Sequence, residues 1–285
     1  MAIAIKLFLY LFLENHFNTI SMKSILVPLG DSEKAICTLQ YAIDFASVVN
    51  AKIYVIQVFG TTKVAGALKN MDELLEKNSK EELAHVLANV DKKGIEIIAK
   101  PVKGQIVDSI NRVATLLNVD LIIASAKNSA ADSSIYLGRI TGGLVKQTEL
   151  PMLIIPKGYK FKAIKTILLS IRSGLIRKPK VLEPLEDLVK NFNTKVNLLH
   201  VITPHNTIED NSLHKGFETI ADTITNSENA TVFQGVLEHL LEVNPDMICV
   251  IRRKRGFFNK LWEQNHIKKV DFESRIPLLI LKGNL

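Results

Sequence analysis

Cysteine is scarce in this chain. Its 285 residues include two cysteines, Cys37 and Cys249, which lie far apart and each beside apolar residues. Two such residues build neither a disulfide framework nor a CxxC metal pair. This usage is typical of a reducing compartment, so the sequence predicts a cytoplasmic location. The apolar neighbours of Cys37 predict a core position for it rather than a role as a nucleophile.

Motifs that mark enzymes are also lacking. GxSxG, Walker A and HExxH do not occur. The seven histidines are scattered, and His200 and His205 have no cysteine or acidic partner at metal-ligand spacing. The sequence therefore predicts a protein that is not an enzyme, with no catalytic residue and no metal, and a structural role for His200. No signature of a sequence-specific nucleic-acid reader occurs either.

No apolar run reaches the roughly 20 residues that a membrane span requires. The apolar stretch at residues 2–13 is interrupted by Lys6 and lacks the flanks of a secretory signal. A natural domain start, MKSILVPLGDSEKA, follows from Met22. We therefore expect residues 1–21 to be an extension outside the fold. A membrane-surface anchor is the alternative reading of this segment.

A duplicated domain is present in what remains. The chain is 47% hydrophobic, enough for a full core, and its length suggests about two domains. NVDLIIAS at 118–125 matches NPDMICVI at 244–251, and LPMLIIP at 150–156 matches IPLLILK at 276–282, both with an offset of 126 residues. ILVPLG at 25–30 pairs with ILLSIR at 167–172, and AKIYVIQVF at 51–59 with TKVNLLHVI at 194–202. We expect domains at 22–158 and 159–285, joined through KGYKFKAIK at 157–165.

Within each half, short β-branched runs alternate with helical patterns. The first half predicts strands at 25–29, 53–59, 95–100, 121–125 and 152–155, which are apolar on both faces, as in a parallel sheet covered by helices. Helical spacing runs through Ile36, Leu39, Ile43 and Ala46 and through Ile106, Ile110, Val113 and Leu117. The charge-rich segment 67–92 carries Met71, Leu74, Leu75, Leu83, Val86 and Leu87 on one side.

The second half repeats this plan with one difference. A helical period returns at 230–243, whereas 205–220 is shorter than its counterpart and lacks a clear period. Alternating strands and helices predict an α/β fold of two tandem, doubly wound, parallel five-stranded sheets. Such sheets bind ligands beyond the carboxyl ends of their strands.

The order ILVPLGDSEKA, a helix, AKIYVIQVF, DLIIAS, a loop and PMLIIP resembles the universal stress protein family, whose fold is Rossmann-like. The resemblance covers nearly all of residues 22–285 as two tandem copies. It implies a role in adaptation to stress such as starvation or oxidants. It also implies that the halves dock through their last strands, at 152–155 and 278–281, as an intramolecular pseudo-dimer. A homodimer of such tandem chains stays open.

Nucleotide-binding members of that family carry G-x2-G-x9-G-[ST] after the fourth strand and an Asp just after the first. The glycines let backbone N–H groups approach the phosphates at a helix N-terminus. Here Ser125 and Asn128 replace two glycines, Gly138 is kept, and Arg139 replaces the hydroxyl residue. The degenerate phosphate site implied in the first half consists of Pro28, Gly30, Asp31, Ala124, Ser125, Lys127, Asn128, Gly138, Arg139 and Ile140.

The second half departs further from the motif. Ile251, Lys254, Gln264 and Asn265 occupy its four positions, and Arg172 replaces the acid. The loop RRKRGFFNKLW could bind an acidic lipid, a nucleic acid or a phosphate ligand, or it could be an apolar anchor with its charges in water. The candidate anion site here consists of Arg172, Arg253, Lys254 and Asn265.

Two functions stay open at this point. The first is a non-enzymatic regulatory or ligand-binding stress-response module without a cofactor, whose partner is an unknown small anionic ligand or a protein. The second is a sensor that binds ATP or AMP through the first half. Because most motif glycines, the acid and the hydroxyl are replaced, we expect ATP to bind weakly or not at all.

Overall fold

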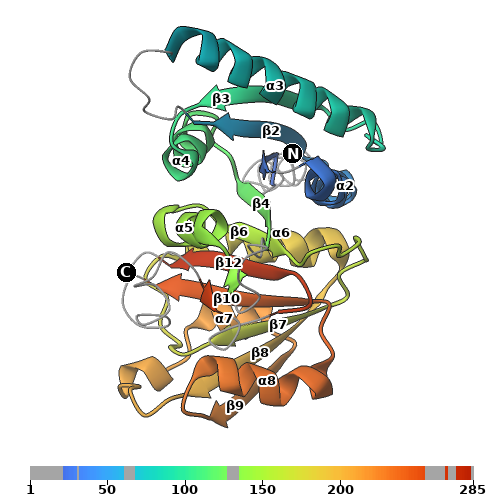
Figure 1. Cartoon of the computed structure of the whole chain (residues 1–285). Coiled ribbons are helices and arrows are strands. Elements are labelled where there is room, and N and C mark those ends of the chain that lie inside the picture. The colour runs from blue at the N-terminus through green and yellow to red at the C-terminus, as the bar shows by residue number, and fades with distance from the viewer. Residues whose placement is uncertain are drawn as a thin grey trace, which may run out of the picture.

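The computed structural model describes residues 22–30, 32–60, 68–126, 135–253, 267–268 and 274–283. Strands and helices alternate through both halves of this part of the chain, as Figure 1 shows. Residues 1–21, which we expected to lie outside the fold, are not among the described residues. Asp31, Lys127, Asn128, Lys254 and Asn265 of the two candidate sites are outside them as well.

Ten strands form one sheet in the order β3-β2-β1-β4-β6-β12-β10-β7-β8-β9. In the first half these are β1 (Ser24–Leu29), β2 (Lys52–Phe59), β3 (Ile97–Lys103), β4 (Leu121–Ser125) and β6 (Met152–Ile155). In the second half they are β7 (Thr166–Ile171), β8 (Lys195–Ile202), β9 (Thr223–Glu228), β10 (Met247–Arg253) and β12 (Leu278–Gly283). Each half is a parallel five-stranded sheet, so the predicted fold class is confirmed.

The two halves meet through their last strands. β6 and β12 pair antiparallel, with Leu153 opposite Leu279, while the other neighbouring strands of the large sheet pair in parallel. The predicted docking of these two strands is therefore confirmed. A second antiparallel pair, β5 (Ile135–Leu137) with β11 (Ile267–Lys268), also joins the halves and was not predicted.

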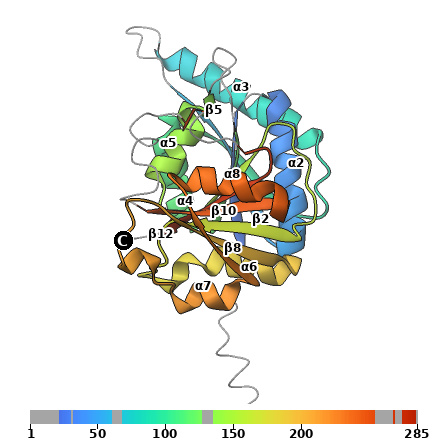
Figure 2. The ribbon, with the colours of Figure 1, turned by 90° about the horizontal axis from the view of Figure 1, so that it is seen from below.

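Helices cover both faces of the sheet (Figures 1 and 2). On one face the core contains residues of α2 (Ser32–Val49), α3 (Leu68–Ala88), α6 (Glu183–Phe192) and α7 (Lys215–Ile220). On the other face it contains residues of α4 (Ile106–Leu116), α5 (Arg139–Gln147) and α8 (Val232–Val243). Short 3-10 turns, η1 (Pro179–Val181) and η2 (Glu209–Asn211), lie in the second half.

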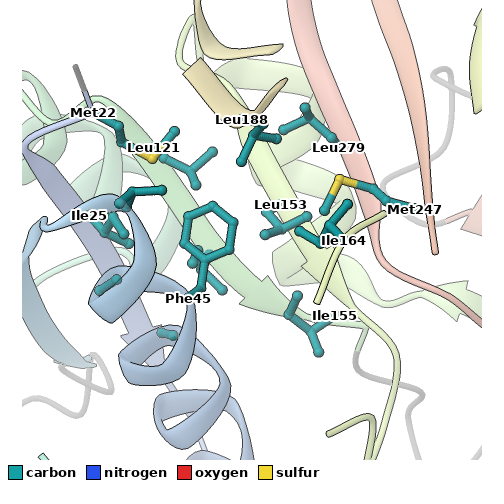
Figure 3. Packing of buried hydrophobic residues seen from close by; sticks show 14 of the residues in the cluster. Met22, Ile25, Phe45, Leu121, Leu153, Ile155, Ile164, Leu188, Met247 and Leu279 are labelled. Atoms are coloured by element: carbon teal, nitrogen blue, oxygen red, sulfur yellow. The ribbon is translucent and has the colours of Figure 1, made fainter. Parts of the chain in front are cut away.

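One core cluster runs across the boundary between the halves (Figure 3). Phe45 of α2 packs on Phe192 of α6 with ring centroids 5.5 Å apart. The linker takes part, because Phe161 meets Tyr41 edge to face at 5.4 Å and Ile164 is only 2% exposed. The aromatic linker residues therefore form part of the core between α2 and α6.

The duplication is visible in how the helices end. Asn50 and Asn193 follow α2 and α6 with positive φ values of 55° and 51°. Asn118 and Asn244 follow α4 and α8 with φ values of 46° and 43°. Asparagine enters this left-handed region more readily than most residues, and it ends a helix there. Both pairs lie at matched positions of the sequence repeat.

Several details differ from the sequence-based expectations. β3 lies a few residues later than predicted, and β9 was missed because its TITNSE sequence is polar and mostly exposed at the sheet edge. Met71 and Leu74 are 49% and 51% exposed, so the apolar side predicted for α3 holds only in its second part.

Cys37 is exposed, so its predicted core position is wrong. The reason is helical geometry. Leu39, two residues later, is fully buried, and residues two apart on a helix point to nearly opposite sides.

Candidate functional site

A cavity of about 290 Å³ opens at the carboxyl edge of the first half. β1 and β4 are neighbours in the sheet and both end there. From β1 the chain enters α2 on one face, and from β4 it goes on to α5 on the other face. This divergence is the topological switch point at which doubly wound sheets bind ligands.

Half of the residues predicted for the first-half site line this cavity. They are Pro28, Gly30, Ala124, Ser125 and Ile140. Gly138 is the N-cap residue of α5, and the exposed Arg139 is the first residue of that helix. The remaining three predicted residues lie outside the described part of the chain.

Polar residues that the motif does not include also line the cavity. Lys34 and Thr38 come from the first two turns of α2, and Glu82 comes from α3. Gln57, at the end of β2, donates from Nε2 to Oε2 of Glu82. Sequence reasoning missed these residues because the family motif covers only the two chain segments that follow β1 and β4.

The N-terminus of α5 is held against β4. Thr141 Oγ1 donates to the carbonyl oxygen of Ser125 at 3.0 Å. Gly138 has no side chain to cap the helix, and Ile140 and Thr141 of its first turn line the cavity. First-turn amides have no partner within a helix and form the positive end of its dipole. This end of the cavity therefore favours an anionic or hydrogen-bond-accepting group.

The corresponding edge of the second half is arranged differently. Arg172 follows β7, and its carbonyl oxygen accepts from His200 Nε2 at 3.2 Å and from Asn206 Nδ2 at 2.7 Å. His200 is 2% exposed, which agrees with a structural role. β7 and β10 are paired. Arg172 directly follows β7, and Arg253 is the last residue of β10, so the two arginines lie at the ends of neighbouring strands. The anion site predicted around them stays a prediction.

A segment after β8 covers the end of β7. The amide of Gly174 donates to the carbonyl oxygen of Asp210 at 2.7 Å. The amide of His214 donates to the carbonyl oxygen of Gly174 at 2.9 Å. Burial alone would raise the pKa of Asp210. Hydrogen bonds from Ser173 and Thr207, and the nearby charge of Arg172, lower it overall. This carboxylate is therefore held ionised beside the candidate arginine.

Within the described ranges, no group of three or more histidine, cysteine or acidic side chains could hold a metal ion. None of the helices found there combines the length and apolar character that crossing a bilayer requires.

Comparisons with known proteins agree with this geometry. The model of the Universal stress protein family matches residues 22–156. Universal stress protein MJ0531 of Methanocaldococcus jannaschii is 24% identical over 143 residues, which cover 48% of this chain and 84% of that protein. The match to the family model therefore lies in the first half.

Solved structures extend the likeness to the fold of both halves. A universal stress protein from Archaeoglobus fulgidus has a TM-score of 0.69 at 19% identity and covers 93% of this chain and 97% of its own. A putative universal stress protein from Pseudomonas aeruginosa has a TM-score of 0.61 at 14% identity, covering 93% and 94%. The chain thus matches the Universal stress protein family model at residues 22–156, and its fold resembles that of solved universal stress proteins over both halves.

Proposed function

We propose that this protein is a non-enzymatic, cytoplasmic stress-response module that binds a small ligand in the first-half cavity. The match of residues 22–156 to the Universal stress protein family model supports a stress-response protein of a generally regulatory or ligand-binding kind. The observation that carries the proposal is the cavity at the switch point between β1 and β4. Its volume of about 290 Å³ lies near the lower end of the roughly 300–1,000 Å³ typical of small-molecule sites.

A triphosphate fits this site poorly. Ser125 stands in the cavity wall where nucleotide-binding relatives have a glycine, so its Cβ keeps a phosphate away from the backbone. Each lost hydrogen bond to a charged group removes roughly 1.5–3 kcal/mol. Because about 1.4 kcal/mol is tenfold in affinity, several losses move a micromolar site toward millimolar.

An ATP or AMP sensor working through the same cavity is the second candidate. Arg139 favours it, because a guanidinium at the start of α5 can bind a phosphate through two parallel hydrogen bonds. That contact would replace part of what the lost glycines supplied.

Calorimetry on the full chain with adenosine, AMP and Mg-ATP separates the two. Our proposal expects ATP to bind in the millimolar range or not at all. A low-micromolar affinity for ATP that disappears in Arg139→Ala would show instead that the first half is a nucleotide sensor.

A cavity-blocking variant locates any ligand found in this way. Val58→Phe enlarges a half-buried side chain in the cavity wall and should abolish binding. Val48→Phe makes the same change at a position of α2 that is 40% exposed, and it should leave binding unchanged. A ligand that binds both variants equally would not occupy this cavity.

A further inference from the structure

A second cavity, of about 240 Å³, lies beside the first. Lys34, Thr38 and Ser125 line both cavities. The second is bounded by the start of α2, the end of β6 at Ile155 and the first linker residues, 156–159. It therefore lies at the carboxyl ends of β4 and β6, one strand further toward the centre of the molecule than the first.

The charges that line the second cavity have one sign. Lys34 comes from α2 and Lys157 from the linker, and no carboxylate stands among the described residues of its wall. The first cavity differs, because Glu82 lines it as well as Lys34. The positive end of the dipole of α2, an 18-residue helix, adds to the potential of the two lysines.

The backbone that carries Lys157 is fixed. The amide of Tyr159 donates to the carbonyl oxygen of Pro156 at 3.1 Å and closes a tight turn. Gly158 in that turn has a φ of +71°, a conformation that favours glycine. Tyr159 in turn packs on Tyr41, with ring centroids 6.3 Å apart. Lys157 is thus held at the cavity by a turn that is anchored in the core.

We propose that the second cavity is a phosphate subsite in which Lys34 and Lys157 bind the anion. Lysine binds phosphate as a compact point charge, and two of them from separate elements can approach one group from different sides. The phosphate is either free or the end of a ligand whose body lies in the first cavity. The latter arrangement rests on the proposed function. The lost glycines after β4 matter less here, because side chains replace the backbone donors.

Cys37 gives a direct readout of this subsite. Its thiol is exposed and belongs to the cavity wall, whereas Cys249, the other cysteine, is fully buried. Alkylation of the folded full chain by N-ethylmaleimide, followed by intact mass, therefore reports on Cys37. The experiment compares sodium phosphate with sodium chloride at equal ionic strength. We expect phosphate to slow alkylation at least threefold and in a saturable manner.

The variants decide whether the lysines are responsible. In Lys157→Ala the protection by phosphate should be lost, and in the exposed neighbour Lys160→Ala it should be kept. Each variant is compared with itself, with and without phosphate, so that a change in thiol reactivity alone does not count. Absence of saturable protection, or equal protection in Lys157→Ala, would overturn the subsite.

The source of the phosphate is separated by comparing inorganic phosphate, AMP and adenosine. AMP that protects at lower concentration than phosphate, and loses that advantage in Val58→Phe, supports a ligand spanning both cavities. Equal protection by AMP and phosphate supports a subsite for free phosphate and removes AMP as the ligand. AMP that binds calorimetrically in the first cavity without protecting Cys37 overturns the subsite and leaves the proposed function standing.

Discussion

Lys282 of β12 donates from Nζ to the carbonyl oxygen of Val145 at 2.6 Å, and so ties the second half to the last turn of α5. Arg252 of the neighbouring strand β10 donates to the carbonyl oxygen of Lys146 in the same turn. Cations at a helix C-terminus act as donors to its unpaired carbonyl groups, and they interact favourably with the negative end of its dipole. The helix whose first turn lines the first-half cavity is therefore held at its other end by the second half.

The charge of Lys282 makes this contact dependent on pH. Burial and the nearby Arg252 lower the pKa of Lys282 well below 10.5, and Glu149 opposes this only in part. Between the lowered pKa and 10.5 the unfolded chain binds more protons than the folded one, so the stability of the folded state rises with pH in that window. In that window the free energy of unfolding of the wild type, relative to that of Lys282→Met, should rise by up to about 1.4 kcal/mol per pH unit.

Urea unfolding of the wild type and Lys282→Met between pH 7 and pH 9.5 checks this. The exposed Lys215→Met is the matched control, and its difference from the wild type should stay flat over this range. A difference for Lys282→Met that stays flat or falls with pH would contradict a buried, destabilised ammonium.

Close packing at the second-half edge predicts a sensitive glycine. A Cβ on Gly174 would overlap the backbone carbonyl of Ser212. Because backbone cannot rotate away as a side chain can, Gly174→Ala should destabilise the protein by about 1–3 kcal/mol in urea unfolding. At Gly60 the nearest atom to an added Cβ is 3.8 Å away, so Gly60→Ala should change stability by less than about 0.5 kcal/mol. Equal effects of the two substitutions would disprove the packing argument.

A chain that begins at Met22 should keep the fold. Met22 is only 4% exposed, and its backbone nitrogen donates to Oδ2 of Asp187 at 2.5 Å. A free ammonium at Met22 would give this carboxylate, whose pKa is raised by burial, a cationic partner. Residues 22–285 should therefore melt within a few degrees of the longer chain in calorimetry.

The same contact supplies the control for this shortened chain. Asp187→Asn should destabilise residues 22–285 more than it destabilises the full chain, because only the former loses an ion pair. Aggregation of residues 22–285, or a loss of several kcal/mol, would mean that residues 1–21 pack into the core.

The first half on its own should associate. Residues 22–158 would expose the strand edge and the fully buried side chains of β6, which pair with β12 in the whole protein. Unpaired apolar edges recruit other strands. Light scattering should show dimers or larger species, and Leu153→Lys should shift them toward monomer. A stable monomer without that substitution would disprove the need for docking.

Most strands of the large sheet were predictable because they are short apolar runs that are buried on both faces. β4 and β6 occur at the predicted residues, and β1 and β2 begin one residue early. β9 could not be predicted in this way, since a polar edge strand such as TITNSE has no apolar pattern. The pairing of β5 with β11 joins residues that are at least 130 positions apart, and neither segment carries a signal of its own.

The candidate site was predictable in location but not in composition. The repeat and the strand order fixed the carboxyl ends of β1 and β4 as its place, and Pro28 and Ser125 do lie there. Lys34, Glu82 and Lys157 come from a helix turn, another helix and the linker. Their convergence depends on how the elements pack, which no local pattern records.

The antiparallel pair of β6 and β12 lies within a single chain. Two separate copies would associate in proportion to their concentration, whereas a short linker keeps these halves at a high, fixed effective concentration. Separate identical copies would also have to carry the same residues at both strand edges. Covalent linkage removes that requirement. Gly30 can therefore border an open cavity, whereas at the matched position Arg172 and the residues after it are hydrogen-bonded to the segment that follows β8. One copy can thus change in sequence while the other keeps its cavity.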